Sequence, residues 1–125
     1  MNIANMVGDL KKLDVLIVED GADIREIMET TFDKLFKRTR SAVDGEDGLA
    51  KFKESKPDII ITDIRMPNMS GNEMIEKIKE FDIKTPIIVV SGHGRLISKT
   101  SEADVLLSKP IKFDKLIETI HTLTR

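Results

Sequence analysis

Residues 58–71 read Asp58-Ile59-Ile60-Ile61-Thr62-Asp63-Ile64-Arg65-Met66-Pro67-Asn68-Met69-Ser70-Gly71. Within them, Ile59–Thr62 are four consecutive β-branched residues, a run typical of a strand buried on both faces of a parallel sheet. The run ends in the carboxylate of Asp63, and a turn containing Pro67 follows. Because ligands gather at the carboxyl ends of strands in an open α/β sheet, Asp63 is expected to project into the active crevice. A helix or turn cap is the alternative role for such an Asp, so the rest of the chain has to decide.

Further apolar runs and helix-spaced apolar positions alternate along the rest of the chain. The apolar runs predict strands over 14–20, 86–91 and 105–108, and a further short strand is expected over 39–43. Apolar positions at helical spacing predict helices over 21–37, through 49–52, over 72–81 and over 113–123. Ile24 and Ile27 belong to the apolar face of the first helix, and Phe81 to that of the third. This alternation predicts a doubly wound α/β fold with a five-stranded parallel sheet.

Two segments depart from the alternation. Residues 1–13 are weakly patterned and are expected to form a leader of one or two helical turns outside the core, so that the domain itself spans 14–125. Between Ser91 and Lys109 lie 17 residues, of which the last strand takes about five. A helix of the usual ~10–14 residues does not fit there. The fourth helix is therefore expected to be shortened to about two turns at most, within residues 95–102.

Composition narrows the class of protein. The chain has 125 residues, enough for one domain with its own core. It has no cysteine, which suits a reducing compartment, and neither a signal pattern nor the ~20-residue apolar run that a membrane span needs. A cytoplasmic location without a membrane partner is expected. Its 20 basic and 22 acidic residues and its five aromatics, all Phe, give no support to nucleic-acid binding.

Polar side chains stand at the ends of four predicted strands. They are Glu19 and Asp20, Asp63, Ser91 and Lys109. A doubly wound sheet brings these strand ends together along its carboxyl edge. Three close carboxylates repel one another unless a cation lies among them, and hard oxygen ligands select Mg²⁺ or a similar ion. A cation beside a carboxylate, a hydroxyl donor and a lysine forms a site for a phosphoryl group.

With these residues in this order, the chain resembles a response-regulator receiver domain of bacterial two-component signalling, a family that includes stand-alone chemotaxis regulators. The resemblance covers residues 14–124. Its landmarks are Val18-Glu19-Asp20, Asp63 with Met66-Pro67 and Gly71, Val90-Ser91-Gly92, and Ser108-Lys109-Pro110. The resemblance implies a flavodoxin-like fold with the strand order 2-1-3-4-5.

The resemblance also implies the role of each acidic residue. Asp63 would be phosphorylated, by attack of its carboxylate on the phospho-histidine of a sensor histidine kinase or on a small phosphodonor. Asp20 and Asp63 would bind Mg²⁺ together with the backbone carbonyl of Arg65. Glu19 would hold the ion directly or through water. Mg²⁺ would neutralise charge on the oxygens being transferred.

Two further residues would contact the phosphoryl group. Lys109 would pair with its oxygens, from a Lys109–Pro110 peptide expected to be cis, and the Ser91 hydroxyl would bond one of them. The resemblance therefore implies a phosphoprotein that catalyses its own phosphorylation and dephosphorylation and is not otherwise an enzyme. It would pass the signal on through altered contacts with an output protein, or through a phosphorylation-dependent dimer.

One position departs from the family pattern. Leu106 stands where receivers typically carry Tyr or Phe, a ring whose position reports phosphorylation. The relay is therefore expected to differ from the usual one, with phosphorylation acting by ordering residues 92–102. The glycines on either side of His93 would make that segment easy to reshape.

Other functions also fit parts of the pattern. A haloacid-dehalogenase-like Mg²⁺-dependent phosphatase also orders a nucleophilic Asp, a Ser or Thr and a Lys along its chain. That family usually has a second acid two residues after the nucleophile, where this chain has Arg65. A receiver excised from a longer regulator with an output domain is another alternative. A pseudo-receiver that only binds partners and a flavodoxin-like cofactor carrier fit the site residues less well.

Overall fold

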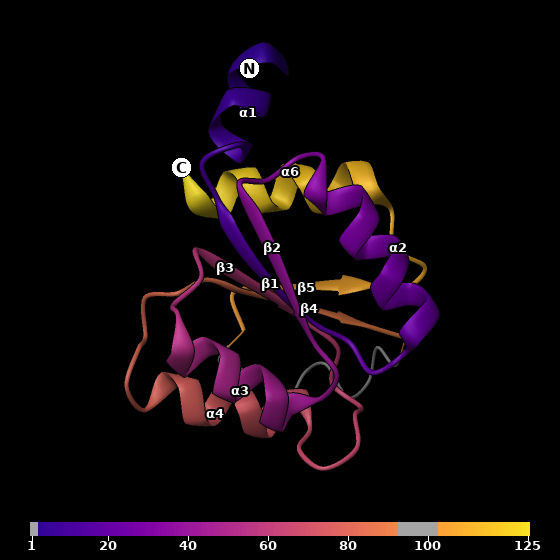
Figure 1. Ribbon diagram of the computed structural model, residues 1–125, viewed down its shortest axis with the longest axis vertical. Coiled ribbons are helices and arrows are strands. Elements are labelled where there is room, and N and C mark those ends of the chain that lie inside the picture. The colour runs from indigo at the N-terminus through magenta and orange to yellow at the C-terminus, as the bar shows by residue number, and fades with distance from the viewer. Residues whose placement is uncertain (1–2, 93–102) are drawn as a thin grey trace.

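A five-stranded parallel sheet forms the centre of the protein, and helices cover both of its faces (Figure 1). The computed structural model describes residues 3–92 and 103–125. The strands are β1 (Asp14–Val18), β2 (Arg38–Ala42), β3 (Ile59–Thr62), β4 (Ile87–Ser91) and β5 (Val105–Ser108). The described helices are α1 (Ile3–Leu10), α2 (Ala22–Asp33), α3 (Gly45–Glu54), α4 (Gly71–Lys79) and α6 (Phe113–Thr124). The spatial order β2-β1-β3-β4-β5 confirms the predicted fold.

The helices divide into two layers: α2 and α6 lie on one side of the sheet, and α3 and α4 on the other (Figure 1). Side chains along β1 alternate between the two layers. Val15 and Ile17 belong to the core cluster under α2 and α6, whereas Leu16 and Val18 belong to the cluster under α3 and α4. All four residues of β3 are buried. The β-branched run is therefore covered on both faces, as its sequence predicted.

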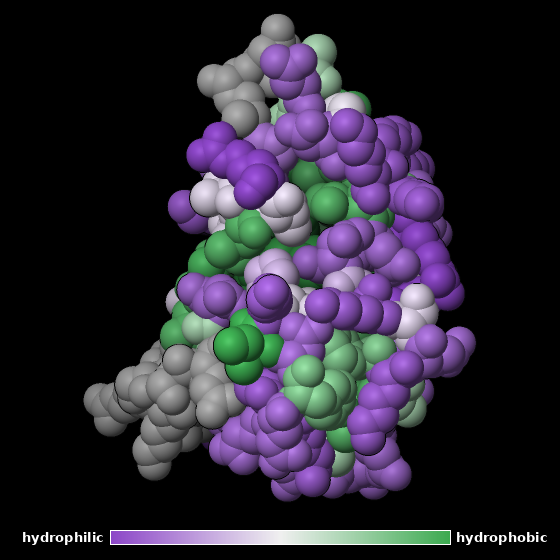
Figure 2. Space-filling view, turned by 90° about the vertical axis from the view of Figure 1, so that its left-hand side faces the viewer, coloured by the Kyte–Doolittle hydropathy of each residue, from purple (hydrophilic) through white to green (hydrophobic). Residues whose placement is uncertain are grey.

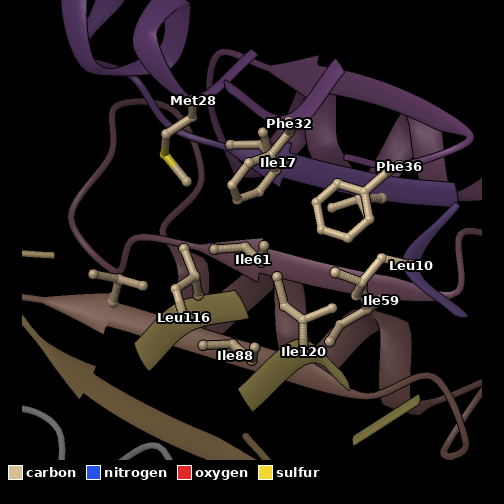
Figure 3. Packing of buried hydrophobic residues seen from close by; sticks show 12 residues of the cluster. Leu10, Ile17, Met28, Phe32, Phe36, Ile59, Ile61, Ile88, Leu116 and Ile120 are labelled. Atoms are coloured by element: carbon tan, nitrogen blue, oxygen red, sulfur yellow. The ribbon is translucent and has the colours of Figure 1, made fainter. Parts of the chain in front are cut away.

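The core beneath α2 and α6 is built from aliphatic strand residues and two helix faces (Figure 3). Phe32 of α2 is fully buried, and its ring meets the ring of Phe36 edge to face with 5.1 Å between centroids. From α6, the neighbouring helix on the same face, Leu116 and Ile120 point toward the same strands (Figure 3). Each fully buried side chain of this size contributes about 1.5–3 kcal/mol relative to an exposed one.

The expectation that residues 1–13 lie outside the core is wrong for Leu10. The segment does form a helix of two turns, α1, but Leu10 is only 1% exposed and belongs to the core under α2 and α6. Met6, one turn earlier, packs against the same core. Asp9 lies 2.9 Å from Nε2 of His121 on α6. Two apolar contacts one turn apart fix this helix. Ile3, Met6, Val7 and Leu10 have the spacing of an apolar helix face, so the segment is more strongly patterned than expected. The division into a leader over 1–13 and a receiver over 14–125 stays a prediction.

Three apolar side chains assigned to buried helix faces are exposed. Ile24 and Ile27 of α2 are 43% and 51% exposed, because the buried face of this helix is set by Met28 and Phe32. Ile27 is one residue from Met28, which rotates it by about 100° around the helix. Phe81 lies beyond the end of α4, is 52% exposed, and rests against the ring of Phe52 at 5.6 Å.

The α4–β4 loop reaches the face shown in Figure 2, where small hydrophobic patches interrupt a mainly hydrophilic surface. Among the described residues, no helix is long and apolar enough to cross a membrane. The shortened helix predicted within residues 95–102 lies outside the described residues. The same holds for the ordering of 92–102 on phosphorylation, apart from Gly92 itself.

Candidate functional site

Four strand ends meet at the carboxyl edge of the sheet and carry the predicted residues there. Glu19 and Asp20 follow β1, Asp63 follows β3, Ser91 is the last residue of β4, and Lys109 follows β5. These four strands are parallel neighbours in the order β1-β3-β4-β5, so their ends lie side by side. A hydrogen bond joins the ends of β1 and β3, since the amide of Asp63 donates to the carbonyl of Val18 at 3.1 Å.

Glu19, Asp20 and Asp63 form an acidic cluster. One carboxylate oxygen of each lies within 4.8 Å of an oxygen from each of the others. Glu19 is buried, with 6% of its surface exposed, and its Oε2 accepts a hydrogen bond from the amide of Gly21 at 2.9 Å. Burial raises the pKa of Glu19, and the neighbouring charge of Asp63 acts in the same direction. A buried carboxylate of this kind is expensive to keep ionised unless a cation is near.

Lys109 supplies the positive charge at this edge. Its Nζ lies 2.8 Å from Oδ2 of Asp63 and 3.8 Å from Oε1 of Glu19. Partial burial acts to lower the pKa of Lys109, but the hydrogen bond and the charge of Asp63 outweigh it, and the pKa is raised. The ammonium group therefore stays protonated at neutral pH. The Lys109–Pro110 peptide is cis, as predicted, and the Lys109 amide donates to the carbonyl of Ser91 at 3.0 Å.

The loop after Asp63 is closely packed. The amide of Ile64 donates to Oδ1 of Asp63 at 2.6 Å, which orients the carboxylate. Further along, the amide of Gly71 donates to the carbonyl of Ile64 at 2.8 Å. A Cβ atom on Gly71 would lie 2.1 Å from the carbonyl oxygen of Asp63, so only glycine allows this approach. Asn68 has a positive φ of 66°, and its Nδ2 donates to Asp44 Oδ2 at 2.7 Å.

The remaining predicted residues lie on the adjoining elements. Ser91 is buried at the end of β4, with 2% of its surface exposed. Arg65 follows Asp63 by two residues in the same loop, and its side chain is exposed. Their positions agree with the predicted site, and their roles stay predictions.

Two contacts at the site were not predicted from the sequence. Arg25 of α2 donates from Nη1 to the backbone carbonyls of Glu19 and Asp20, at 2.9 and 3.3 Å. Asn68 connects the loop after Asp63 to Asp44, the residue that caps α3. In the sequence, Arg25 is an ordinary residue of a predicted helix, and nothing there indicates that it contacts the loop before the helix. This contact becomes visible only in the folded structure.

The donor set of the cluster fits a hard divalent cation. Three carboxylates each offer an oxygen within 4.8 Å of the others, and oxygen ligands from carboxylates are the ones that Mg²⁺ uses in proteins. The described residues contain no thiolate donor, since the whole chain lacks cysteine. An ion bound here would relieve both the mutual repulsion of the carboxylates and the burial of charge on Glu19.

The model of the response regulator receiver domain family matches residues 15–121. That match covers most of the chain, so the protein belongs to this family and is a receiver domain of a two-component system. Receiver domains bind Mg²⁺ at an acidic pocket and interact with histidine kinases and output domains. Members of this family are generally not classical enzymes. The haloacid-dehalogenase-like alternative is not favoured.

Individual relatives agree with the family assignment. The cell cycle response regulator CtrA of Brucella ovis is 31% identical over 115 residues, covering 89% of this chain and 50% of the relative. The N-terminal domain of an uncharacterized protein from Wolinella succinogenes is 39% identical, with a TM-score of 0.82, covering 89% of this chain and 93% of that one. The response regulator TrrA of Thermotoga maritima, solved in complex with Mg²⁺-BeF, is 31% identical, with a TM-score of 0.80, covering 88% and 97%. The chain spans about half the length of the curated relatives it matches.

Proposed function

We propose that this receiver accepts a phosphoryl group on Asp63 from a sensor histidine kinase, or from a small phosphodonor. Mg²⁺ would be held by Asp20, Asp63 and the backbone carbonyl of Arg65, with Glu19 binding it directly or through water. The observation that carries the proposal is the convergence of three carboxylates within 4.8 Å beside the ammonium group of Lys109, 2.8 Å from Asp63.

In the proposed transfer, a carboxylate oxygen of Asp63 attacks phosphorus as the bond to the donor's nitrogen or oxygen breaks. The hydrogen bond from the Ile64 amide to Oδ1 fixes the orientation of the carboxylate before the reaction. Lys109 moves its contact from the carboxylate to the phosphoryl oxygens, and the Ser91 hydroxyl donates to another of them. The bound ion supplies neutralising charge for the oxygens being transferred. In autodephosphorylation, water attacks the phosphorus of phosphorylated Asp63, the bond between phosphorus and the Asp63 oxygen breaks, and inorganic phosphate leaves as the carboxylate is restored.

The test is incubation with acetyl phosphate in the presence and absence of Mg²⁺, followed by intact mass measurement. We expect one phosphoryl group per chain, dependent on Mg²⁺, and none in Asp63→Ala. Asp23→Ala is the matched control, since Asp23 is an exposed acid in the first turn of α2. It should be labelled like the wild type. Labelling of Asp63→Ala at the wild-type rate would reject the assignment.

A turnover assay separates this function from a phosphatase. A phospho-acceptor takes up one phosphoryl group per chain and then releases phosphate only at the slow rate of its own dephosphorylation. A phosphatase instead hydrolyses phosphomonoesters continuously. We expect no sustained release from phosphomonoesters, and sustained release that is lost in Asp63→Ala would favour the phosphatase.

We also propose that the signal leaves the domain through protein–protein contact, with an output protein or with a second copy in a phosphorylation-dependent dimer. Leu106 on the edge strand β5 is 36% exposed and offers an apolar side chain where the family typically has a ring. Because the chain spans only about half of its curated relatives, an attached output domain is an equally valid form of this proposal.

The absence of cysteine is compatible with the reducing cytoplasm, where we propose that the domain acts.

A further inference from the structure

The side chain of Arg25 crosses from α2 to the backbone of the acidic loop. Its Nη1 donates to the carbonyl of Glu19 at 2.9 Å and to the carbonyl of Asp20 at 3.3 Å. These are the two residues that supply carboxylates to the cluster from β1. One guanidinium group therefore holds two consecutive peptide units of the loop whose side chains face Asp63.

Besides Arg25, a hydrogen bond within the loop supports it: the Gly21 amide donates to Oε2 of Glu19 at 2.9 Å. The last connection of the loop to the sheet is the hydrogen bond from the Glu19 amide to the carbonyl of Ala42, at 3.0 Å. The next helix starts at Ala22, and its N-cap residue Gly21 makes no side-chain capping bond. Asp20 thus lies between the sheet and an uncapped helix. Arg25 does not cap the helix, because a guanidinium only donates, but its two hydrogen bonds to carbonyls tie this loop to α2.

Arg25 is itself anchored to the neighbouring strand. Its Nε lies 3.9 Å from Oε1 of Glu29, one turn along α2. The hydroxyl of Ser41 on β2 donates to the same Glu29 oxygen, and Lys51 of α3 donates to the Ser41 carbonyl at 2.6 Å. The Arg25 side chain is mostly buried, with 20% of its surface exposed. The guanidinium therefore has a fixed position from which to hold the loop.

We propose that Arg25 is a positioning residue for the cation site: it fixes the backbone at Glu19 and Asp20 so that both carboxylates converge on Asp63. The inference rests on the proposed function, because it assumes that this cluster binds Mg²⁺. It assigns Arg25 no contact with the ion or with the phosphoryl group.

The sign of the effect on Mg²⁺ affinity separates positioning from simple electrostatics. Arg25 is a cation close to a cation site, so its charge alone opposes Mg²⁺ binding, and removing it would tighten binding. Loss of positioning has the opposite effect, since the ligands must then be ordered when the ion binds. A hydrogen bond to a charged group is strong enough for its loss to weaken binding about tenfold.

The experiment is a Mg²⁺ titration of the full chain, with thermal unfolding measured on each variant. We expect the dissociation constant of Arg25→Ala to rise about tenfold, and that of Arg25→Lys to rise about threefold because an ammonium lacks the second nitrogen for Glu29. The rate of acetyl-phosphate labelling in Arg25→Ala should recover to within about twofold of wild type at saturating Mg²⁺, because Arg25 touches no reacting atom.

Lys79→Ala is the matched control. Lys79 also holds two carbonyls of one loop, those of Ile83 and Thr85 at 3.3 and 3.2 Å, but at the opposite edge of the sheet. It should lower the melting temperature and leave the Mg²⁺ dissociation constant unchanged. Should Arg25→Ala fail to fold, Glu29→Gln removes the anchor and keeps the guanidinium. It should then weaken Mg²⁺ binding about threefold.

Two outcomes would overturn the inference, and they are distinguishable. If Asp20→Asn weakens Mg²⁺ binding but the folded Arg25 variants, or Glu29→Gln in their place, bind with unchanged or tighter affinity, the positioning role is wrong and the proposed function stands. If Asp20→Asn leaves the midpoint of the wild-type titration unchanged, the ion lies elsewhere. The proposed function then fails, and the inference fails with it.

Discussion

Replacing Gly71 with alanine tests how closely the loop after Asp63, the proposed phospho-acceptor, is packed. Gly71 is the first residue of α4, and its amide donates to the carbonyl of Ile64. No described glycine has a positive φ, so backbone conformation does not require glycine here. The requirement is space: an added Cβ would lie 2.1 Å from the Asp63 carbonyl oxygen and 3.0 Å from the Ile64 Cα.

The size of the effect follows from these distances. Real Cβ atoms essentially never approach closer than 3.0 Å, so the backbone at Asp63 must withdraw by about 0.9 Å. Overpacking of a tight site costs about 1–3 kcal/mol. Replacing glycine by alanine in a helix returns up to about 1 kcal/mol of this. We therefore expect the free energy of unfolding to fall by about 1–2 kcal/mol, or about 4–8 °C in melting temperature.

The assay is thermal unfolding together with Mg²⁺ titration, since the displaced atoms belong to Asp63, one of the proposed ligands. Gly71→Ala should lower the melting temperature and weaken Mg²⁺ binding. The control is Gly8→Ala in α1, where an added Cβ has no atom within 4 Å. This change should raise the stability by about 0.5–1 kcal/mol and leave Mg²⁺ binding alone. A Gly71→Ala protein as stable as the wild type, with unchanged affinity, would refute the argument.

Other substitutions test other parts of the account. Leu10→Ala should lower the free energy of unfolding by about 2–4 kcal/mol in denaturant titrations, and a change below about 0.5 kcal/mol would show that α1 does not belong to the core. Asp82→Asn should cost about 1–2 kcal/mol at pH 7, because Asp82 accepts bonds from Lys56 and Thr85, which hold the pKa of Asp82 below its usual range. That stabilisation is complete above the ordinary pKa of about 3.9 and is lost as pH falls below it, so wild type and variant should converge in acid; a constant difference would contradict this. Asp20→Asn should weaken Mg²⁺ binding at least tenfold, about 1.4 kcal/mol, and an unchanged titration midpoint would place the ion elsewhere.

The fold was predictable because its decisive signals are local. The run Ile59–Thr62 is apolar without alternation, and a strand of that kind is stable only between two layers of helices. Parallel strands in turn place their carboxyl ends at one edge, so the positions of Glu19, Asp20 and Asp63 followed from chain order alone. The same logic placed Lys109 at this edge, where its Nζ lies 2.8 Å from Oδ2 of Asp63.

Features that depend on contacts between distant segments were not predictable. Leu10 is buried because α1 packs on α6. The helical spacing of Met6, Val7 and Leu10 indicates an apolar face, but not the surface that this face covers. Ile24 and Ile27 fit the apolar period of α2, yet they lie away from the sheet because Met28 and Phe32 set the rotation of the helix. Periodicity shows that a helix has an apolar face, but not which part of that face the sheet covers.

The polar contacts around the site also could not be predicted from the sequence. Arg25 reaches backwards to two carbonyls, and Asn68 reaches across to Asp44, 24 residues earlier in the chain. Backbone acceptors leave no mark in a sequence, because every residue carries one. Such contacts are visible only once the loops are placed. The positions of the three carboxylates were therefore predictable from the sequence, whereas the side chains that hold their backbone were not.

The most direct test of the central claim is to locate the phosphoryl group within the chain. Protein treated with acetyl phosphate and Mg²⁺ is reduced with borohydride, which converts a phosphorylated aspartate to homoserine, and is then digested and sequenced by mass spectrometry. The account predicts homoserine at position 63 alone, dependent on Mg²⁺ and absent without acetyl phosphate. Homoserine at position 20 or at another aspartate, or its absence from position 63 in a protein that has gained a phosphoryl group, would contradict it.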